Sequence, residues 1–95
     1  MKREQRRIVC RDGAITSVKQ MAERGTARSE RLVARAAVVV RSMEVDGPPS
    51  NTVKYKLRQG RMLYVYKLAG VRFEFFDDGR TIEIIDIEFK PRESI

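Results

Sequence analysis

The sequence predicts an α+β domain in which a helical half is followed by a sheet half. Residues 12–44 carry apolar side chains at helical spacing, whereas residues 52–90 alternate between apolar and polar side chains as a β-strand does. Residues 47–51 (Gly-Pro-Pro-Ser-Asn) separate the two halves, because proline ends a helix and favours extended chain. For 95 residues we expect one domain, residues 1–95, with the helices packed on one face of the sheet.

The chain is expected to begin with a short strand at Arg7–Arg11 and to continue into a first helix. Asp12 is a typical N-cap residue, so this helix is predicted from about residue 13 to residue 24. Gly25 follows, and glycine is the usual residue just beyond a helix C-terminus. The apolar positions of the helix are Ile15, Val18, Met21 and Ala22.

A second helix is predicted from the capping residue Thr26 to about Met43. Its apolar stripe contains Leu32, Val33, Ala36, Ala37, Val40 and Met43. Arg28, Arg31 and Arg35 are spaced by three and four residues, so they share another face, which we interpret as solvated. The β-branched run at residues 38–40 is also compatible with a strand, but the register of the stripe favours a helix.

The sheet half is predicted to form a four-stranded antiparallel meander. Its expected strands are Val53–Arg58, Met62–Leu68, Val71–Phe76 and Thr81–Phe89. Two-residue turns at 59–60, 69–70 and 78–79 set the register. The cross-strand pairs expected from these turns are Tyr55 with Tyr64, Tyr66 with Phe73, Lys67 with Arg72, Phe75 with Ile82 and Glu74 with Glu83.

The last strand changes its apolar parity, because Ile82 and Ile84 are followed by Ile85, Ile87 and Phe89. Either a β-bulge between Ile84 and Ile85 or burial of both faces at the sheet centre explains this pattern.

The alternation predicts two chemically different faces of the sheet. The core face is expected to hold Val53, Tyr55, Leu57, Met62, Tyr64, Tyr66, Leu68, Val71, Phe73, Phe75, Ile82 and Ile84. The face in water is expected to be cationic, with Lys54, Lys56, Arg58, Arg61, Lys67 and Arg72. Leu63, Val65 and Phe76 also point to this open face, where either a partner or the tail at residues 91–95 would cover them.

The net charge and the scarcity of His and Cys favour some classes of function and argue against others. The formal net charge of +7 favours an anionic partner, most plausibly RNA, although a basic domain without such a partner is the alternative. The chain has no His and one Cys, which argues against a zinc site, a disulfide within the chain and Cys–His catalysis. No cofactor is expected, since there is no Gly-rich phosphate loop. Without a signal peptide or a membrane-spanning run, we expect a cytoplasmic protein.

One predicted cluster of charged residues has the composition of a site that binds and cleaves a phosphodiester. In the expected register Lys67, Arg72, Glu74 and Glu83 gather on the open face. Two cations can grip a phosphate while a carboxylate acts as acid or base. The alternative is a lattice of surface salt bridges, each of which contributes little.

The order of a short strand, two helices and a meander resembles the RelE/ParE-like toxins of bacterial type II toxin–antitoxin systems, including the HigB and phage-borne branches. The motif-like part is residues 63–75 (LYVYKLAGVRFEF), followed by an acidic-Gly turn and an apolar strand with a basic end. It looks like the L-Y-R-x-R-x-G-x-Y-R-x-x-Y segment of that family.

The resemblance implies an mRNA endonuclease that acts on the ribosome without a metal, inhibits translation and is neutralised by a cognate antitoxin. It assigns Lys67, Arg72 and Lys90 or Arg92 to holding the mRNA phosphate and stabilising charge during attack by a 2′-hydroxyl. Glu74 and Glu83 are the candidate general bases. The implied RNA-contacting residues are Lys54, Lys56, Arg58, Arg61 and Arg92.

Departures from the family segment keep two alternatives open. Val65 stands where the family often has Arg, Lys67 replaces an arginine, and no Tyr or His follows the last strand. ParE-like members lack the nuclease set and poison DNA gyrase instead. A binding module of a phage or mobile element, without catalysis, is the other alternative.

Overall fold

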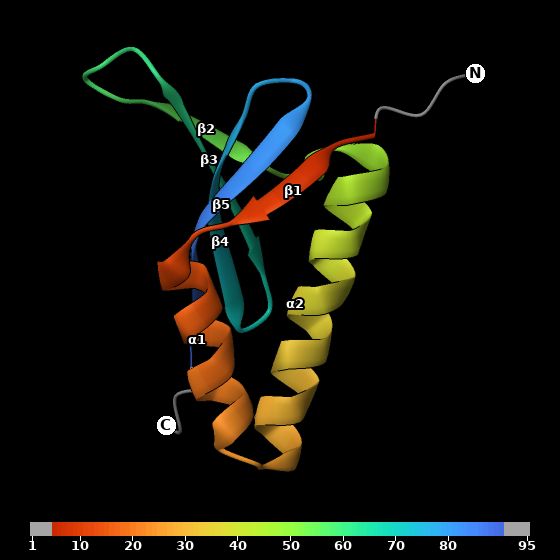
Figure 1. The fold of residues 1–95 in the computed structure, drawn as a ribbon. Coiled ribbons are helices and arrows are strands. Elements are labelled where there is room, and N and C mark those ends of the chain that lie inside the picture. Colours follow the sequence, from red (N-terminus) through yellow and green to blue (C-terminus); the bar gives the residue numbers. More distant parts are fainter. Residues whose placement is uncertain (1–4, 91–95) are drawn as a thin grey trace.

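The computed structural model describes residues 5–90, which form two helices and one five-stranded sheet (Figure 1). The helices are α1 (Asp12–Glu23) and α2 (Ala27–Asp46). The strands are β1 (Arg7–Cys10), β2 (Val53–Lys56), β3 (Met62–Leu68), β4 (Val71–Asp77) and β5 (Thr81–Phe89). The α+β class and the helical pair before the meander are therefore confirmed.

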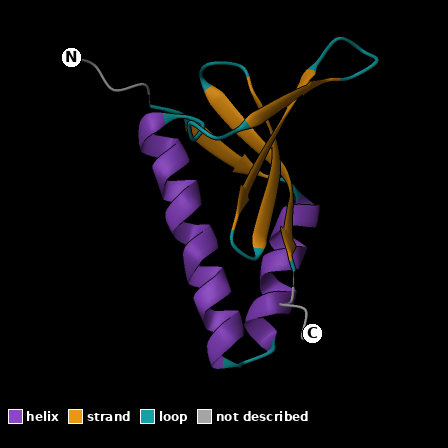
Figure 2. Cartoon of the chain, turned by 180° about the vertical axis from the view of Figure 1, so that it is seen from behind, coloured by secondary structure: helices purple, strands orange, loops and turns teal. Residues whose placement is uncertain are grey.

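The sheet has the order β1-β5-β4-β3-β2 and is mixed. Strands β2 to β5 are antiparallel neighbours, but β1 pairs in parallel with β5. The predicted four-stranded antiparallel sheet is thus corrected to five strands. Parallel pairing requires a long connection between the two strands, and here both helices and strands β2 to β4 lie between β1 and β5. Both helices lie on the same side of the sheet, as the two opposite views show (Figures 1 and 2).

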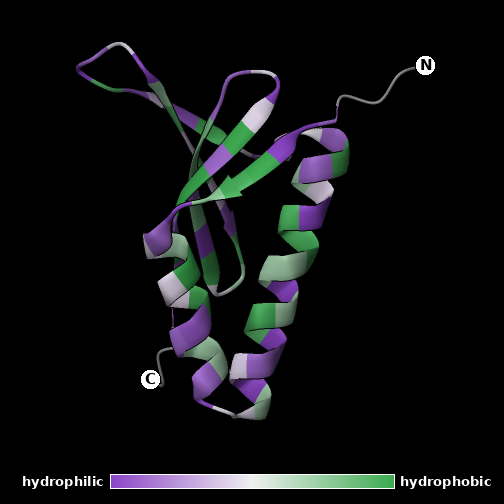
Figure 3. Ribbon diagram, viewed as in Figure 1, coloured by the Kyte–Doolittle hydropathy of each residue, from purple (hydrophilic) through white to green (hydrophobic). Residues whose placement is uncertain are grey.

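The core lies between the helices and one face of the sheet. Its fully buried side chains include Phe73 and Phe75 from β4, Ile82 and Ile84 from β5, and Met43 from α2. Tyr64 and Tyr66 pack against this core, and their rings lie 5.5 Å from the ring of Phe75 and 6.1 Å from that of Phe73. Hydrophobic and hydrophilic residues are interspersed along both helices (Figure 3). The buried residues of α2 recur every three or four positions and so share one face: Ser29, Leu32, Ala36, Val39 and Met43.

The second helix begins as predicted. Thr26 accepts a hydrogen bond from the backbone N–H of Ser29, and Ser29 accepts one from the backbone N–H of Thr26. Gly25, with φ of 67°, supplies the left-handed residue between the two helices. The predicted N-cap of α1 is wrong by one residue: Arg11 occupies that position, and Asp12 is the first helical residue, where its charge favours the helix dipole.

The register of β2 against β3 differs from the prediction. A three-residue loop at 58–60 joins these strands, because Leu57 N–H bonds to Arg61 O and Gly60 adopts φ of 83°. Lys54 therefore lies opposite Tyr64, and Tyr55 opposite Leu63. The one-residue shift turns Val53 and Tyr55 out of the core face, and both residues are 51% exposed. The hairpin also projects beyond the helices in both views (Figures 1 and 2).

The register of β4 against β5 also differs. Asp78 N–H bonds to Thr81 O, so residues 79–80 are the centre of the turn, with Gly79 at φ of 92°. Phe75 consequently lies opposite Ile84 rather than Ile82, on the same face as predicted. Beyond that pair Glu74 lies opposite Asp86, so Ile85 is an extra residue on β5. This bulge decides between the two explanations of the changed parity.

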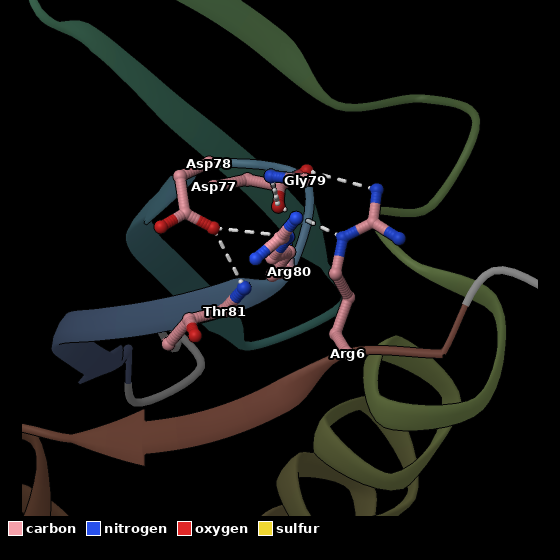
Figure 4. A network of polar contacts seen from close by, with 6 residues as sticks. All are labelled: Arg6, Asp77, Asp78, Gly79, Arg80 and Thr81. Atoms are coloured by element: carbon pink, nitrogen blue, oxygen red, sulfur yellow. Dashed lines mark hydrogen bonds and ion pairs between the residues drawn. The ribbon is translucent and has the colours of Figure 1, made fainter.

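A network of polar contacts holds the β4–β5 turn (Figure 4). Arg6 donates from Nε to Asp77 Oδ1 over 2.9 Å and from Nη2 to Asp77 Oδ2 over 3.4 Å. Asp78 Oδ1 accepts from the backbone N–H groups of Arg80 and Thr81 over 2.8 and 2.7 Å. The N–H groups of the turn are satisfied within it, and its start is tied to the segment before β1.

Candidate functional site

The turn between β3 and β4 lies against helix α2. Leu68 and Val71 close it, as the predicted register requires, and Gly70 has φ of 83°. Arg35 of α2 donates from Nη1 to Ala69 O over 2.7 Å, and Lys90 N–H donates to Gly70 O over 2.9 Å. The turn is thus held by α2 on one side and by the end of β5 on the other.

One pocket of about 220 Å³ lies at the strands that enter and leave this turn, and we call it the strand-side pocket. Its lining residues are Lys67, Leu68, Ala69, Gly70, Val71, Arg72 and Lys90. Lys67 and Arg72 are direct cross-strand partners, as predicted, which places two like charges side by side. The pocket brings Lys67, Arg72 and Lys90 together, although Lys90 is far from the other two in sequence.

A second pocket, of about 420 Å³, lies on the other side of the same turn. We call it the helix-side pocket; it is lined by Arg28, Arg31, Leu32, Arg35, Ala69, Gly70 and Lys90. Ala69, Gly70 and Lys90 line both pockets. No Asp or Glu of the described chain lines either one, so six cations surround a single turn: Arg28, Arg31, Arg35, Lys67, Arg72 and Lys90.

Arg72 is joined to Glu74, two residues along the same strand. Arg72 Nη1 donates to Glu74 Oε2, and the side chains of both are 27% exposed. This hydrogen bond raises the pKa of the Arg72 guanidinium above its ordinary value, so Arg72 is charged at every accessible pH. Because a guanidinium carries five N–H donors, Arg72 can orient Glu74 and still offer donors to an anion.

Glu83 is not part of this cluster, contrary to the prediction. The shifted register places Glu83 opposite Phe76 rather than opposite Glu74. It instead accepts from Arg11 Nε, and its Oε1 lies 3.8 Å from Nη2 of Arg61. Glu83 therefore does take part in surface ion pairs, but with Arg11 and Arg61 rather than with the Lys67 and Arg72 of the predicted lattice.

The open face as a whole is mixed rather than cationic. Asp86 lies opposite Glu74 and Glu88 opposite Arg72, because the bulge at Ile85 turns both acidic residues to this side. The expected positive surface is thus balanced by carboxylates on β5. An excess of cations remains at the β3–β4 turn, where the arginines of α2 add to those of the sheet.

The other predicted RNA-contacting residues do not join the turn. Lys54 and Lys56 lie on the other face of β2, with Lys54 Nζ 5.7 Å from the centre of the Tyr64 ring. Arg58 is exposed in the β2–β3 loop. Arg61 does lie on the open face, where its guanidinium covers the Phe76 ring at 3.7 Å. Arg92 lies outside the described residues.

The arginines of α2 were missed by the sequence prediction, which assigned them to a solvated face. Their spacing of three and four residues did show that they share one side of the helix. It did not show which part of the sheet that side approaches. The contact that brings them to the turn, between Gly70 and the neighbouring Leu32, is tertiary, and the sequence carries no signal for it.

Other kinds of site find little support in residues 5–90. No group of three His, Cys, Asp or Glu in this range is placed to hold a metal ion. Burial raises the pKa of the Cys10 thiol, which disfavours the nucleophilic thiolate. Neither α1 nor α2 has the combination of length and hydrophobicity that crossing a membrane requires.

Comparison with known proteins finds no matching family model, no matching curated protein and no matching solved structure. The function therefore has to be inferred from the residues of this chain. The six cations around the β3–β4 turn are the feature with the clearest chemical consequence, because they line two neighbouring concave sites and give both a positive charge.

Proposed function

We propose that this chain is a toxin of the RelE/ParE type that binds mRNA on the ribosome and cleaves it at the strand-side pocket. The observation that carries the proposal is that Lys67, Arg72 and Lys90 line one pocket. These are the positions that the family resemblance assigns to the RNA phosphate. A cluster of three cations in a concave site binds a phosphate and stabilises negative charge that develops on it.

The proposed reaction uses the RNA itself as the nucleophile. The ribose 2′-oxygen forms a bond to the neighbouring phosphorus, and the bond from phosphorus to the 5′-oxygen breaks. Glu74 accepts the proton of the 2′-hydroxyl, and the ammonium of Lys67 or Lys90 supplies a proton to the departing 5′-oxygen. In this proposal Arg72, which lines the pocket, holds the phosphate oxygens, and its hydrogen bond holds the carboxylate of Glu74 at the edge of the pocket.

The test is primer extension on a defined mRNA in a cell-free translation reaction. With the wild-type protein we expect new 5′ ends that require ribosomes, and we expect Arg72→Ala and Lys67→Ala to abolish them. Arg80→Ala is the matched control, because Arg80 is exposed in the β4–β5 turn and contributes to neither of the two pockets. Intact message with the wild type, or cleavage that persists in Arg72→Ala, contradicts the proposal. Circular dichroism checks that each variant is folded.

The second candidate is ParE-like action on a protein target without RNA cleavage. It is favoured by an apolar group on the open face, in which Val53 and Tyr55 are half exposed beside Val65 and Leu63. An exposed apolar group next to charged residues is typical of a protein-binding surface. Growth arrest that is lost in Tyr55→Ala and retained in Arg72→Ala, with message intact, would favour this function.

The cations at the β3–β4 turn also suggest how an antitoxin would act. A cognate antitoxin with an acidic segment would neutralise the cations at the β3–β4 turn and exclude RNA from them.

If the chain instead binds RNA with steep salt dependence and without toxicity, it is a nucleic-acid-binding module.

A further inference from the structure

The helix-side pocket has a charge arrangement that the fold itself does not explain. Arg28, Arg31 and Arg35 approach Lys90 across the β3–β4 turn. Gathering four cations in one concavity raises the energy of the folded state through mutual repulsion. Among the described residues, the one ion pair that involves α2 is Arg41 with Glu44. Arg28 and Arg31 therefore have no carboxylate partner within residues 5–90.

One arginine of the pocket is already fixed in position. Arg35 donates to Ala69 O with Nη1, which leaves further N–H groups of the same guanidinium to meet an anion. The pocket wall is rigid as well, because Leu32 is 5% exposed and packs against Gly70. A preorganised guanidinium on a rigid wall binds an anion with a small loss of conformational entropy.

The position of Lys90 connects this pocket to the strand-side pocket. Lys90, Ala69 and Gly70 line both, so the two pockets are the two sides of one turn. A flexible polyanion that crosses the turn can place one anionic group in each pocket. Arginine clusters favour phosphate, because the planar guanidinium donates two parallel hydrogen bonds to its oxygens.

We propose that the helix-side pocket binds a second backbone phosphate of the same RNA strand whose reacting phosphate occupies the strand-side pocket. This inference rests on the proposed function, since it takes a single-stranded RNA as the ligand. It adds that the strand crosses the β3–β4 turn toward α2, with Arg28, Arg31 and Arg35 as its contacts there. Binding through backbone phosphates carries no base preference by itself.

The experiment measures how salt weakens binding of a fluorescein-labelled single-stranded RNA of roughly ten nucleotides. Fluorescence anisotropy gives the dissociation constant at several salt concentrations for the wild type and for the double variant Arg28→Gln/Arg31→Gln. We expect the slope of log affinity against log salt to become shallower by about 0.7 for each phosphate that the variant no longer neutralises. Arg41→Gln is the matched control: it removes the same kind of charge from the same helix outside the pocket, and we expect the wild-type slope.

Two results would overturn the inference. One is a double variant with the same slope as Arg41→Gln. The other is a competition experiment in which a polyglutamate peptide of equal charge displaces the labelled RNA as effectively as unlabelled RNA does. That result would mean that the pocket attracts any polyanion and does not select phosphates.

The two proposals fail separately. An unchanged slope in the double variant, together with message cleavage that requires Arg72, overturns the second phosphate site and leaves the toxin proposal standing. RNA binding without message cleavage by the wild type overturns the toxin proposal, while a shallower slope in the double variant still supports a phosphate site on α2. Thermal unfolding of each variant verifies that the substitutions at these surface positions leave the fold intact.

Discussion

Gly70 in the β3–β4 turn lies directly against Leu32 of α2: a Cβ atom on Gly70 would come within 2.8 Å of Leu32 Cδ2. Gly70 also has φ of 83°, a conformation that residues with a side chain rarely adopt. This contact seats the turn on the helix and so brings the cations of the sheet beside the arginines of α2. The fold and the candidate site depend on the same glycine.

Gly70→Ala is therefore expected to destabilise the protein for two separate reasons. The positive φ costs about 1–2 kcal/mol with a side chain present, and overpacking against Leu32 costs about 1–3 kcal/mol more. Gly60→Ala is the matched control, since Gly60 has the same φ of 83° but a Cβ atom there would meet nothing within 4 Å. Urea unfolding of both variants measures the difference, and equal losses would show that the turn does not press on α2.

The β3–β4 hairpin could be predicted from the sequence because its signals agree. The turn Ala69-Gly70 allows a two-residue loop, and the apolar parity on either side matches it. Tyr66 opposite Phe73 and Lys67 opposite Arg72 are consequently confirmed.

The neighbouring hairpins were predicted incorrectly because a loop's length is decided by backbone conformation that the sequence leaves ambiguous. Gly60 can end either a two-residue or a three-residue loop, and the longer loop reverses which of Lys54 and Tyr55 faces the core. At the other hairpin, Asp78 accepts backbone hydrogen bonds and becomes the residue before the turn centre. That shift separates Glu83 from Glu74.

The helix-side pocket could not be predicted, since it depends on how α2 is rotated and translated over the sheet. Helical spacing places Arg28, Arg31 and Arg35 together, but the contact of Leu32 with Gly70 and the bond from Arg35 to Ala69 are tertiary. Lys90 reaches the same place through the end of β5, far along the chain.

The buried ion pair of Arg6 and Asp77 predicts a large effect of a single truncation. The side chains of both residues are 8% exposed, and the pair is bidentate. Asp77→Ala removes this carboxylate from a buried guanidinium, which we expect to cost about 3–5 kcal/mol of unfolding free energy. Glu44→Ala, which breaks the exposed Arg41–Glu44 pair, should cost at most about 1 kcal/mol. Chemical denaturation compares them; similar losses would mean that the buried pair contributes no more than a surface pair.

Asp78 predicts a specific dependence of stability on pH. Backbone hydrogen bonds from Thr81 and Arg80 lower the pKa of Asp78 in the folded state. A carboxyl group with a lowered folded pKa stabilises the protein above its unfolded pKa of about 3.9, and this stabilisation is lost as the pH falls through the folded value. Asp78→Asn keeps an acceptor oxygen but does not titrate, so its stability should fall less than that of the wild type from about pH 6 to pH 3.

The control for this titration is Asp78→Ala, which removes the acceptor as well as the charge. We expect it to be less stable than Asp78→Asn at every pH, because the N–H groups of Arg80 and Thr81 lose their side-chain partner. Urea unfolding curves recorded across the pH range give the comparison. Parallel pH profiles for the wild type and Asp78→Asn would show that this carboxyl group is not linked to folding.

Glu74 is the carboxylate that the proposed reaction uses as a base, and its position beside Arg72 makes the role testable. Glu74→Gln keeps the length of the side chain and an oxygen that can accept from Arg72, but it cannot take a proton. We expect ribosome-dependent cleavage to fall about 10²–10⁴-fold, the usual contribution of general acid–base catalysis, while RNA binding is retained. Glu83→Gln is the matched control, because Glu83 pairs with Arg11 and Arg61 away from the pocket. We expect this variant to cleave message at the wild-type rate. Measuring the cleavage rate at saturating ribosomes separates chemistry from binding. Wild-type cleavage by Glu74→Gln would exclude Glu74 as the base.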